Sequence, residues 1–332
     1  MNITVILCTY NRCLSLAKAL ASIAASTLPE SVRWEVLVVD NNSTDQTRIV
    51  VEEFRQQFPG RFRYLFEPRP GKSFALNSGT RDSQADILVF TDDDVVVEPT
   101  WLRNLTAPLG DTQWTGIGGR TLLERTFTQP PWLALQGPYN LGSLLGAEFD
   151  LGEKQQALHS APYGANMAFR RYVFEKYGGF RTDLGPRPDS MIRNEDTDYG
   201  CRLLDAGEKL LYEPSAVVYH SVSESRMRKE YFLNWSFDFG RACVRMWPQG
   251  PDIFGIPRRF FTLSKMAALT LPLRGLRWML DWSPPRSFFL KCGVWTTLGH
   301  IAELYSQLRD GSDGTEDPPR KETFSKKAQW VR

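Results

Sequence analysis

Three consecutive aspartates, Asp92, Asp93 and Asp94, directly follow an apolar run that ends at Thr91. Adjacent carboxylates repel one another, so they need a cation or several N–H donors nearby. Hard divalent cations such as Mg²⁺ and Mn²⁺ prefer oxygen ligands of this kind, and substrate phosphates often complete their coordination shell. The alternative is a solvated acidic turn, which a position at the carboxyl edge of a parallel sheet would disfavour. The triplet therefore indicates chemistry on a metal-bound phosphate.

Two other apolar runs also end in residues that could hold a ligand. The run at residues 3–8 is followed by Thr9, Tyr10, Asn11 and Arg12. A flat aromatic ring with polar neighbours suits a nucleobase. The run at residues 34–39 ends in Asp40, whose carboxylate could accept hydrogen bonds from a base N–H or a ribose hydroxyl. Apolar runs that each end in ligand-type residues form a stronger pattern together than any one of them alone.

Basic residues precede the third expected helix, in the segment Arg69-Pro70-Gly71-Lys72-Ser73. A helix N-terminus with cations beside it suits a phosphate group. Ordinary surface charge is the alternative for both Arg69 and Lys72.

An acidic run, Asn194-Glu195-Asp196, opens an expected helix at residues 194–206. Acidic side chains in a first turn interact favourably with the helix dipole, which explains part of the run. A carboxylate there could also act as a general base toward a hydroxyl group. His220 follows a short apolar strand farther along the chain, where a histidine is either structural or a metal ligand.

The first 120 residues alternate short β-type runs with helical patterns. We expect strands at residues 3–9, 34–39, 62–66 and 86–91, and helices at residues 15–26, 45–58 and 73–83. This alternation predicts an α/β fold with a mostly parallel sheet and helices on both faces. Right-handed crossovers place the carboxyl ends of such strands at one edge, where ligands bind. Thr9, Asp40 and Asp92 should therefore meet at that edge.

Beyond residue 115 the pattern is less regular. Strands are expected at residues 115–121, 163–170 and 216–220. Residues 126–162 are rich in proline and glycine, which favours a mobile loop or lid. A helical, basic and aromatic C-terminal region is expected after residue 221.

The composition excludes several classes of protein. The chain has 332 residues, a formal net charge of +2 and 42% hydrophobic residues, which is enough to fill a core and excludes overall disorder. Its five cysteines are scattered, which excludes a disulfide scaffold and indicates reduced thiols in a cytoplasmic protein. The N-terminus shows no secretory signal pattern, and no run is long and apolar enough to span a membrane.

The charge is divided unevenly along the chain. Residues 1–223 contain 22 basic and 27 acidic residues, whereas residues 224–332 contain 18 basic and 11 acidic residues. Within residues 225–291, basic side chains are mixed with Phe, Trp, Leu and Met, which is typical of helices at the surface of an anionic membrane. The alternative is a helical subdomain that packs on the first 222 residues through its apolar face. Nucleic-acid binding is not expected, because no recognised module is present.

Seven segments of the chain occur in the order and spacing of glycosyltransferase family 2. They are TVILCTYNR, VVDNNSTDQT, GKSFALNSG, FTDDDV, GANMAFRR, NEDTDYGCRLLDAG and EPSAVVYH. The resemblance covers residues 1–222 and implies a GT-A (Rossmann-like) fold, a nucleotide-diphospho-sugar donor and inversion at the anomeric carbon. It also implies a divalent cation, Mn²⁺ or Mg²⁺, and family frequency favours a UDP-sugar. The resemblance thus predicts an enzyme of the hexosyltransferase type.

Individual residues take their expected roles from the motifs of this family. Asp92 and Asp94 match its DxD motif and, with His220, would hold the metal. The donor-binding residues would be Thr9, Tyr10, Asn11, Arg12, Asp40, Lys72, Asp92, Asp93, Gly164 and Asn166. Asp196 matches the catalytic base, with Glu195 as the alternative because the acidic pair can be aligned in either register.

The chain departs from the processive members of the family. It lacks their Gln-x-x-Arg-Trp motif and their membrane spans, so transfer of one sugar per encounter is expected. The acceptor would be a glycan or a lipid-linked precursor of a surface polysaccharide. Transfer would take place at the cytoplasmic face of a membrane, with peripheral contact through residues 225–291. Arg226 and Arg228 could reach the donor phosphates.

Two alternative functions share part of this pattern. A sugar-1-phosphate nucleotidyltransferase has a similar sheet but needs a glycine-rich N-terminal loop, which Thr9-Tyr10-Asn11-Arg12 is not. A non-catalytic nucleotide-sugar binding protein would not need the acidic pair Glu195-Asp196.

The predicted organisation has three parts. Residues 1–222 form the catalytic domain, with a nucleotide-sugar half at about 1–120 and an acceptor half at about 121–222. Residues 223–310 form a basic and aromatic helical region, and residues 311–332 a polar flexible tail.

Overall fold

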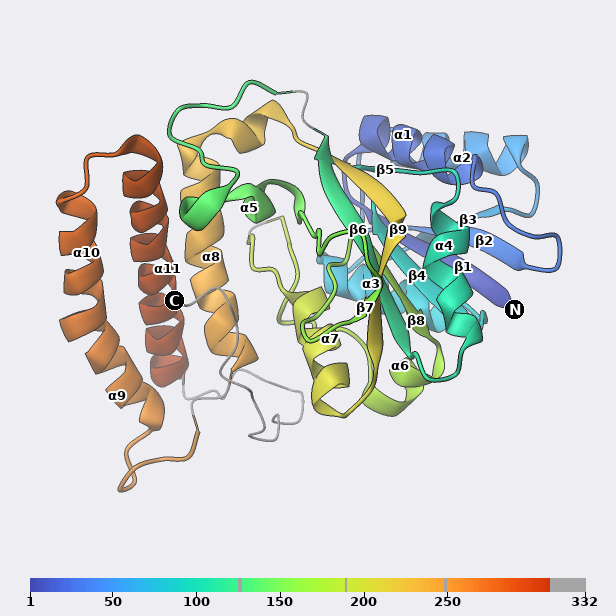
Figure 1. The fold of residues 1–332 in the computed structure, drawn as a ribbon. Coiled ribbons are helices and arrows are strands. Elements are labelled where there is room, and N and C mark those ends of the chain that lie inside the picture. The colour runs from blue at the N-terminus through green and yellow to red at the C-terminus, as the bar shows by residue number, and fades with distance from the viewer. Residues whose placement is uncertain (125–126, 189, 248–249, 311–332) are drawn as a thin grey trace.

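A mixed sheet with helices on both faces adjoins a separate layer of long C-terminal helices (Figure 1). The computed structural model describes residues 1–310 apart from 125–126, 189 and 248–249. The predicted tail at residues 311–332 lies outside the described residues. Within them, nine strands form one sheet in the order β3-β2-β1-β4-β8-β6-β9-β5, and β7 pairs with β9.

The first half of the sheet is parallel. It contains β3 (Phe62–Phe66), β2 (Arg33–Asp40), β1 (Asn2–Thr9) and β4 (Ile87–Asp92). The register pairs Thr9 with Asp40 and Cys8 with Asp92. The polar residues that end these strands therefore lie side by side at one edge, as the alternating pattern predicts.

The second half of the sheet is mixed and brings a histidine to the same edge. It contains β8 (Asn166–Arg170), which runs antiparallel to β4, then β6 (Gly116–Glu124), β9 (Leu210–Ser221), β5 (Val95–Val97) and β7 (Gln156–Ala157). β5 directly follows the aspartate triplet, and its Val95 pairs with His220 on β9. This register places His220 next to the aspartate triplet, which directly precedes Val95.

Two hydrophobic cores hold the helices against the sheet. One face is covered by α1 (Cys13–Ala24), α2 (Thr47–Gln57) and α4 (Trp101–Thr106), and the other by α3 (Lys72–Asp82), α6 (Tyr172–Tyr177) and α7 (Glu195–Asp205). Alternate residues of β1 serve the two cores, with Val5 and Leu7 on one face and Ile6 and Cys8 on the other. A strand buried on both faces has to be apolar throughout, which explains its nearly continuous apolar sequence.

The proline- and glycine-rich region is more ordered than the sequence predicts. After η1 (Ala107–Gly110) and β6, the chain forms η2 (Gly137–Tyr139) and the short helix α5 (Gly142–Gly146). Leu133, Leu141 and Leu145 are buried there and pack with Phe232 and Phe288 of the C-terminal helices. Long-range apolar contacts therefore order a segment whose local sequence favours a loop.

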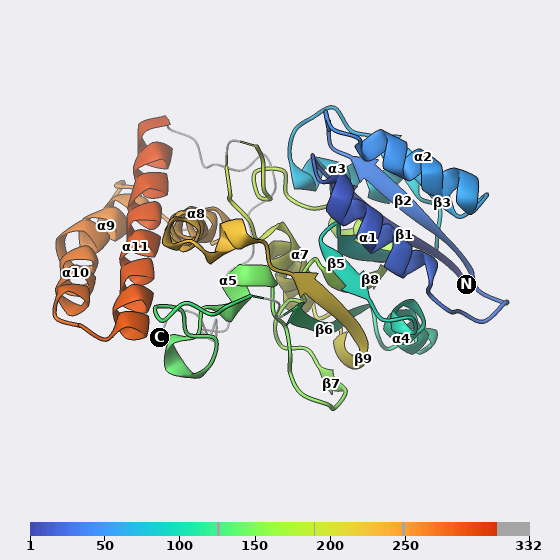
Figure 2. The same ribbon diagram turned by 90° about the horizontal axis from the view of Figure 1, so that it is seen from above.

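The C-terminal region is helical, as predicted (Figure 2). It consists of η3 (Glu224–Met227), α8 (Lys229–Met246), α9 (Arg258–Lys265), the π-helical turn η4 (Met266–Thr270), α10 (Leu271–Met279) and α11 (Pro284–Asp310). Helices α8 and α11 approach each other closely at two glycines. A Cβ atom on Gly240 would lie 2.1 Å from the Thr296 carbonyl oxygen, and one on Gly299 would lie 1.9 Å from that of Phe237. Only glycine permits this packing.

The outer helices expose apolar side chains instead of burying them. Helices α9 and α10 and the turn η4 contain no buried residue. Leu269, Leu273, Leu276 and Leu280 recur at helical spacing and are each at least half exposed, and Trp282 is 90% exposed. No helix among the described residues is long and apolar enough to cross a membrane.

Candidate active site

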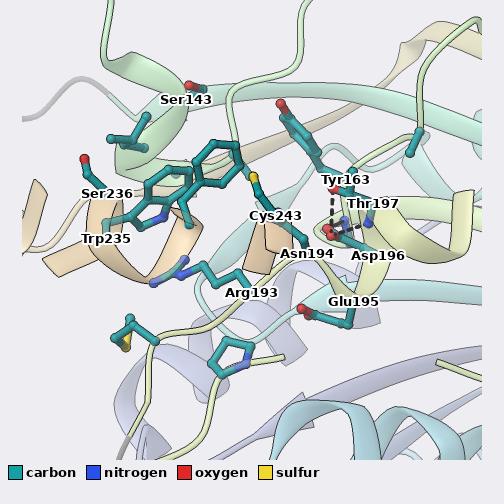
Figure 3. Close-up of a pocket in the computed structure, with 18 of the residues that line it drawn as sticks. Ser143, Tyr163, Arg193, Asn194, Glu195, Asp196, Thr197, Trp235, Ser236 and Cys243 are labelled. Carbon is teal, nitrogen blue, oxygen red and sulfur yellow. Dashed lines mark hydrogen bonds between the residues drawn. The ribbon is translucent and has the colours of Figure 1, made fainter. Parts of the chain in front are cut away.

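A cleft of about 1340 Å³ opens at the carboxyl edge of the sheet and continues along the C-terminal helices. Its sheet side is formed by the ends of β1 and β4 and by the start of α7, and its far side by α8, α10 and α11. Figure 3 shows residues from both sides, with Asp196 on α7 and Trp235 on α8. Residues far apart in the sequence thus share one cavity.

Two of the three consecutive aspartates and His220 form a cluster that could hold a metal ion. Each of Asp92, Asp94 and His220 offers a ligand atom, and these atoms all lie within 4.8 Å of one another. His220 Nε2 is 3.2 Å from Asp94 Oδ1. Two carboxylates and an imidazole suit a divalent cation such as Mn²⁺ or Mg²⁺. The pairing of β5 with β9 brings His220 close to the aspartates, although they are far apart in sequence.

The middle aspartate points to different partners. Asp93 is buried, and its carboxylate accepts hydrogen bonds from Thr9 Oγ1 at 2.7 Å and Arg12 Nη1 at 2.9 Å. Burial raises the pKa of Asp93 to about 6 even though Arg12 opposes the shift. The structure thus ties the Asp93 carboxylate to Thr9 at the end of β1 and to Arg12.

Basic side chains compensate Asp94. Arg12 Nη1 lies 2.9 Å and Arg226 Nη2 2.8 Å from the same Oδ2 atom of Asp94. Burial opposes ionisation of Asp94, but the neighbouring His220, Arg226 and Arg12 side chains outweigh it and lower the pKa of this carboxyl. Arg226, from η3, therefore lies beside Asp94 and lines the cleft, whereas Arg228 is not among the lining residues.

Lys72 joins the aspartates to the acidic start of α7. Its Nζ lies 2.6 Å from Asp92 Oδ1 and 3.6 Å from Glu195 Oε1. Burial opposes the charge on Lys72, but Asp92 and Glu195 outweigh it and raise its pKa. Burial raises the pKa of Glu195 to about 7, although Lys72 opposes this shift. Arg69, in contrast, pairs with Glu67 and does not line the cleft.

Asp196 is fixed in the cleft by backbone N–H groups (Figure 3). Its Oδ2 accepts a hydrogen bond from the Gly164 N–H at 2.6 Å, and its Oδ1 accepts one from the Thr197 N–H at 2.6 Å. A Cβ atom on Gly164 would lie 3.1 Å from Asp196 Oδ2, so a small residue is needed there. Burial and the nearby Asp196 raise the pKa of Tyr163 to about 12. The carboxylate is thus held in one orientation beside the cavity.

The end of β1 and the loop after β2 form the remaining part of the sheet edge. Tyr10 is 41% exposed and lines the cleft with Thr9 and Arg12. Asp40 is buried, and its carboxylate accepts hydrogen bonds from the Ser43 N–H at 2.8 Å and the Tyr64 hydroxyl at 2.8 Å. Asn11 Oδ1 accepts the Thr44 N–H at 2.7 Å. Asp40 and Asn11 therefore shape the loop next to Tyr10 and do not line the cleft.

Asn166 lies beneath the site, outside the cleft lining. Its Oδ1 accepts a hydrogen bond from Trp101 Nε1 at 2.8 Å, and its Nδ2 donates to the carbonyl oxygens of Arg120 and Ala216. Both polar atoms of this amide form hydrogen bonds within the protein, and they link β8 to β6 and β9.

Several lining residues were not found by sequence reasoning. Arg193 directly precedes the acidic run, and Figure 3 shows its side chain extending toward Trp235 of α8. The whole far side of the cleft, from α8, α10 and α11, was also missed. The basic and aromatic composition of residues 225–291 was a signal for this wall, but composition alone does not show which side chains turn inward.

Comparison with known sequences identifies a family and several curated relatives. The family model described as glycosyl transferase family 2 matches residues 4–178, more than half of the chain. The chain is 28% identical over 247 residues to the succinoglycan biosynthesis protein ExoM of Rhizobium meliloti, covering 74% of this chain and 75% of the relative. It is 26% identical over 260 residues to a glucosyl-dolichyl phosphate glucuronosyltransferase of Haloferax volcanii, covering 76% and 80%.

Solved structures share the fold. The mannosyltransferase PcManGT from Pyrobaculum calidifontis, in complex with GDP-Man and Mn²⁺, has a TM-score of 0.61 and 20% identity, covering 92% of this chain and 87% of that chain. GalNAc-T7 with UDP, GalNAc and Mn²⁺ has a TM-score of 0.52 and 15% identity, covering 77% and 52%. At these identities the likeness concerns the fold, and it confirms the predicted GT-A class with its C-terminal helical region.

Proposed function

The chain belongs to glycosyltransferase family 2 and is a glycosyltransferase, and we propose that it is an inverting, metal-dependent and non-processive one. In this proposal a sugar moves from a nucleotide-diphospho-sugar, a UDP-sugar, to a hydroxyl group of a glycan or lipid-linked acceptor. The observation that carries it is one cleft that holds both the cluster of Asp92, Asp94 and His220 and the fixed carboxylate of Asp196. The first set suits a metal-bound diphosphate, and the second suits removal of a proton.

The donor diphosphate is proposed to bind at the cluster of Asp92, Asp94 and His220. The donor atoms of these three residues fit Mn²⁺ or Mg²⁺, and both structural neighbours are complexes with Mn²⁺. A bound divalent cation there would neutralise charge on the departing nucleotide. Arg226 and Lys72, which line the cleft beside the aspartates, would bind phosphate oxygens when the donor enters.

The nucleoside is proposed to lie against the end of β1. Tyr10 presents a half-exposed ring suited to stacking on a base, and Thr9 and Arg12 lie beside it. Asp40 and Asn11 would act by holding the loop that borders the base, because their carboxylate and amide oxygens already accept hydrogen bonds from that loop.

Asp196 is proposed as the general base. It would take the proton from the acceptor hydroxyl while that oxygen attacks the anomeric carbon from the face opposite the departing nucleotide, which inverts the configuration. Hydrogen bonds from the N–H groups of Gly164 and Thr197 keep the carboxylate oriented toward the cavity. Glu195 is the weaker candidate because it is 3% exposed and lies 3.6 Å from the Lys72 ammonium.

The acceptor is proposed to be a precursor of a surface polysaccharide at a membrane. Two relatives support this, one a succinoglycan biosynthesis protein and the other a transferase that acts on glucosyl-dolichyl phosphate. The exposed leucines of η4 and α10 also support it, because Lys265 ends α9 directly before η4 and Arg277 lies on α10. Apolar side chains beside cations suit the interface of an anionic bilayer.

The test is transfer of a labelled sugar from a panel of nucleotide-sugars to lipid extracts and soluble glycans. We expect product with one UDP-sugar, formed only with Mn²⁺ or Mg²⁺ and abolished by EDTA, with the opposite anomeric configuration to the donor. Product of retained configuration would contradict inversion. Full activity in EDTA would contradict metal dependence, and absence of product with every donor would contradict the proposed reaction.

A further inference from the structure

The cleft extends well beyond the residues assigned to donor and base. Its far side, here called the helical wall, is the part formed by α8, α10 and α11. Single small-molecule pockets usually measure about 300–1000 Å³, whereas this cleft measures about 1340 Å³. The cavity therefore has room for a second ligand beside the donor.

The helical wall contains two arginines without acidic partners. Arg274 Nη1 donates hydrogen bonds to the Gly293 carbonyl oxygen at 3.0 Å and to Thr297 Oγ1 at 2.9 Å, both on α11. Arg277 lies one turn away on α10 and also lines the cleft. Neither forms an ion pair with any residue that the structure describes. Burial and the charge of Arg277 lower the pKa of Arg274.

A third cation faces the wall from the sheet side. Arg193 lines the cleft, and its side chain extends toward Trp235 on α8 (Figure 3). Its Nε atom is buried and has no hydrogen-bond partner among the described residues. This arrangement differs from that of Arg12 and Arg226, which are neutralised by Asp94 in the same cleft. A buried donor without a partner is costly, so an anionic ligand would be stabilised there.

The helical wall also contains apolar side chains. The cleft is lined there by Trp235, Phe239, Met246, Met266, Phe289 and Leu290, with polar residues such as Ser236 and Thr296. A hydrophilic sugar phosphate or a free nucleotide would gain little from such walls, whereas a lipid chain would bury apolar surface against them. The continuation of α10 into the exposed leucines also gives a lipid chain a path toward a bilayer.

On the basis of the proposed transferase function, we infer that the helical wall binds the phosphate of a polyisoprenyl-phosphate-linked acceptor through Arg274, Arg277 and Arg193. The isoprenoid chain lies along the apolar side chains of α8 and α11. The sugar end of the acceptor then reaches from the helical wall to Asp196 on α7. The phosphate is a binding group in this arrangement, and a sugar hydroxyl is the nucleophile.

The test is binding of farnesyl phosphate to the full chain, measured by quenching of tryptophan fluorescence, since Trp235 and Trp247 line the cleft. Farnesol and inorganic phosphate serve as separate probes of the chain and the phosphate. We expect farnesyl phosphate to bind more tightly than either. Arg274→Gln should weaken its binding about ten- to a hundredfold, the usual effect of losing a charge-assisted hydrogen bond, and Arg277→Gln and Arg193→Gln should weaken it less.

The control variant is Arg103→Gln, which removes an exposed arginine on α4 outside the cleft and should leave binding unchanged. Equal binding of farnesol and farnesyl phosphate would overturn the inference, as would variants that bind farnesyl phosphate normally. If Arg274→Gln does not fold, the binding of farnesyl phosphate to Arg277→Gln and Arg193→Gln decides.

If these variants weaken UDP binding instead, the arginines bind the donor, and the inference is wrong while the transferase function stands. Failure of every nucleotide to bind, with farnesyl phosphate binding intact, would count against the proposed function and not against this site.

Discussion

The carboxyl edge of the sheet and the outer helices differ in whether their charged side chains have partners within the protein. At the sheet edge each aspartate of the triplet contacts a basic partner, Lys72 for Asp92, Arg12 for Asp93, and Arg12, Arg226 and His220 for Asp94. On α10, Arg274 and Arg277 have no acidic partner among the described residues, and leucines face outward.

This difference indicates what each region needs from outside the chain. The ion pairs at the sheet edge compensate the charges of the aspartates when no ligand is bound. When a donor binds, its phosphates would take over the basic side chains that now pair with the aspartates. The outer helices contain arginines without acidic partners among the described residues, and apolar side chains that stay exposed. We propose that a lipid-linked ligand and a membrane bind these surfaces, and changing one region at a time tests the comparison.

The largest effect should come from Asp196→Asn. The amide cannot accept a proton, so turnover should fall by about 10²–10⁴-fold, the usual contribution of a general base. UDP affinity should stay unchanged, because the metal cluster is intact. The measurements are steady-state transfer and nucleotide titration, with Glu53→Gln on α2 as the exposed control. Near-wild-type turnover of Asp196→Asn would remove this residue from the mechanism.

A second change should disturb the helical layer and leave the sheet edge intact. In Gly240→Val the new side chain would meet the backbone of α11, where a Cβ atom would lie 2.1 Å from the Thr296 carbonyl oxygen. We expect a loss of up to about 3 kcal/mol in the stability of the helical layer and loss of farnesyl phosphate binding, with UDP binding kept. Thermal unfolding and the two titrations measure this.

Gly275→Val is the matched control for this change, because a Cβ atom on Gly275 would meet nothing within 4 Å. It should leave unfolding and both ligands unaffected. Loss of UDP binding in Gly240→Val would show that the sheet edge depends on the helical layer, against the comparison drawn above.

The buried charges of the sheet edge should appear in the pH dependence of stability. Burial raises the pKa of Glu195 to about 7, above its ordinary value of 4.5. Between these values the folded state binds more protons than the unfolded state, so this group makes folding less favourable as pH rises. Relative to Glu195→Gln, the wild type should lose about 3 kcal/mol between pH 4.5 and pH 7.5. Denaturant titrations of both proteins measure the difference, and a difference that does not vary with pH would contradict it.

The smallest effect should come from the outer surface. Leu273→Asp combined with Leu276→Asp places charges on the exposed face of α10 and should lower binding to vesicles containing anionic phospholipid by about tenfold or more. Ile49→Asp on α2, also an exposed apolar position, is the control. Turnover with a soluble acceptor should not change in either protein. Unaltered vesicle binding by the double variant would mean that this face does not contact lipid.

The sequence predicted the sheet edge well because local patterns determine it. The apolar runs place Thr9, Asp40 and Asp92 at strand ends, and parallel pairing brings strand ends together. The orientation of each side chain was not predictable in the same way. The pattern suggested that Asp40 faces a ligand, but its carboxylate accepts hydrogen bonds from Ser43 and Tyr64.

The helical wall could not be predicted, because it depends on contacts between distant segments. Arg193 and Arg274 are 81 positions apart, and nothing in their local sequence shows that both line one cleft. The segment around Leu133 and Leu145 reads as a loop for the same reason, since its order comes from packing against α8 and α11. Composition indicated a basic and aromatic region but left open whether its apolar side chains pack inward or face a membrane. In the structure, apolar side chains of α8 and α11 pack inward, whereas those of α10 are exposed.

The central claim is that Asp92, Asp94 and His220 form a metal-dependent nucleotide site at the sheet edge. Its most direct test is calorimetric titration of the purified protein with UDP, GDP and dTDP, each with and without Mn²⁺, repeated on Asp94→Asn. We predict tight binding of UDP that requires Mn²⁺ and is lost in Asp94→Asn. Binding of no nucleotide, or UDP binding that neither Mn²⁺ nor Asp94→Asn alters, would contradict the claim.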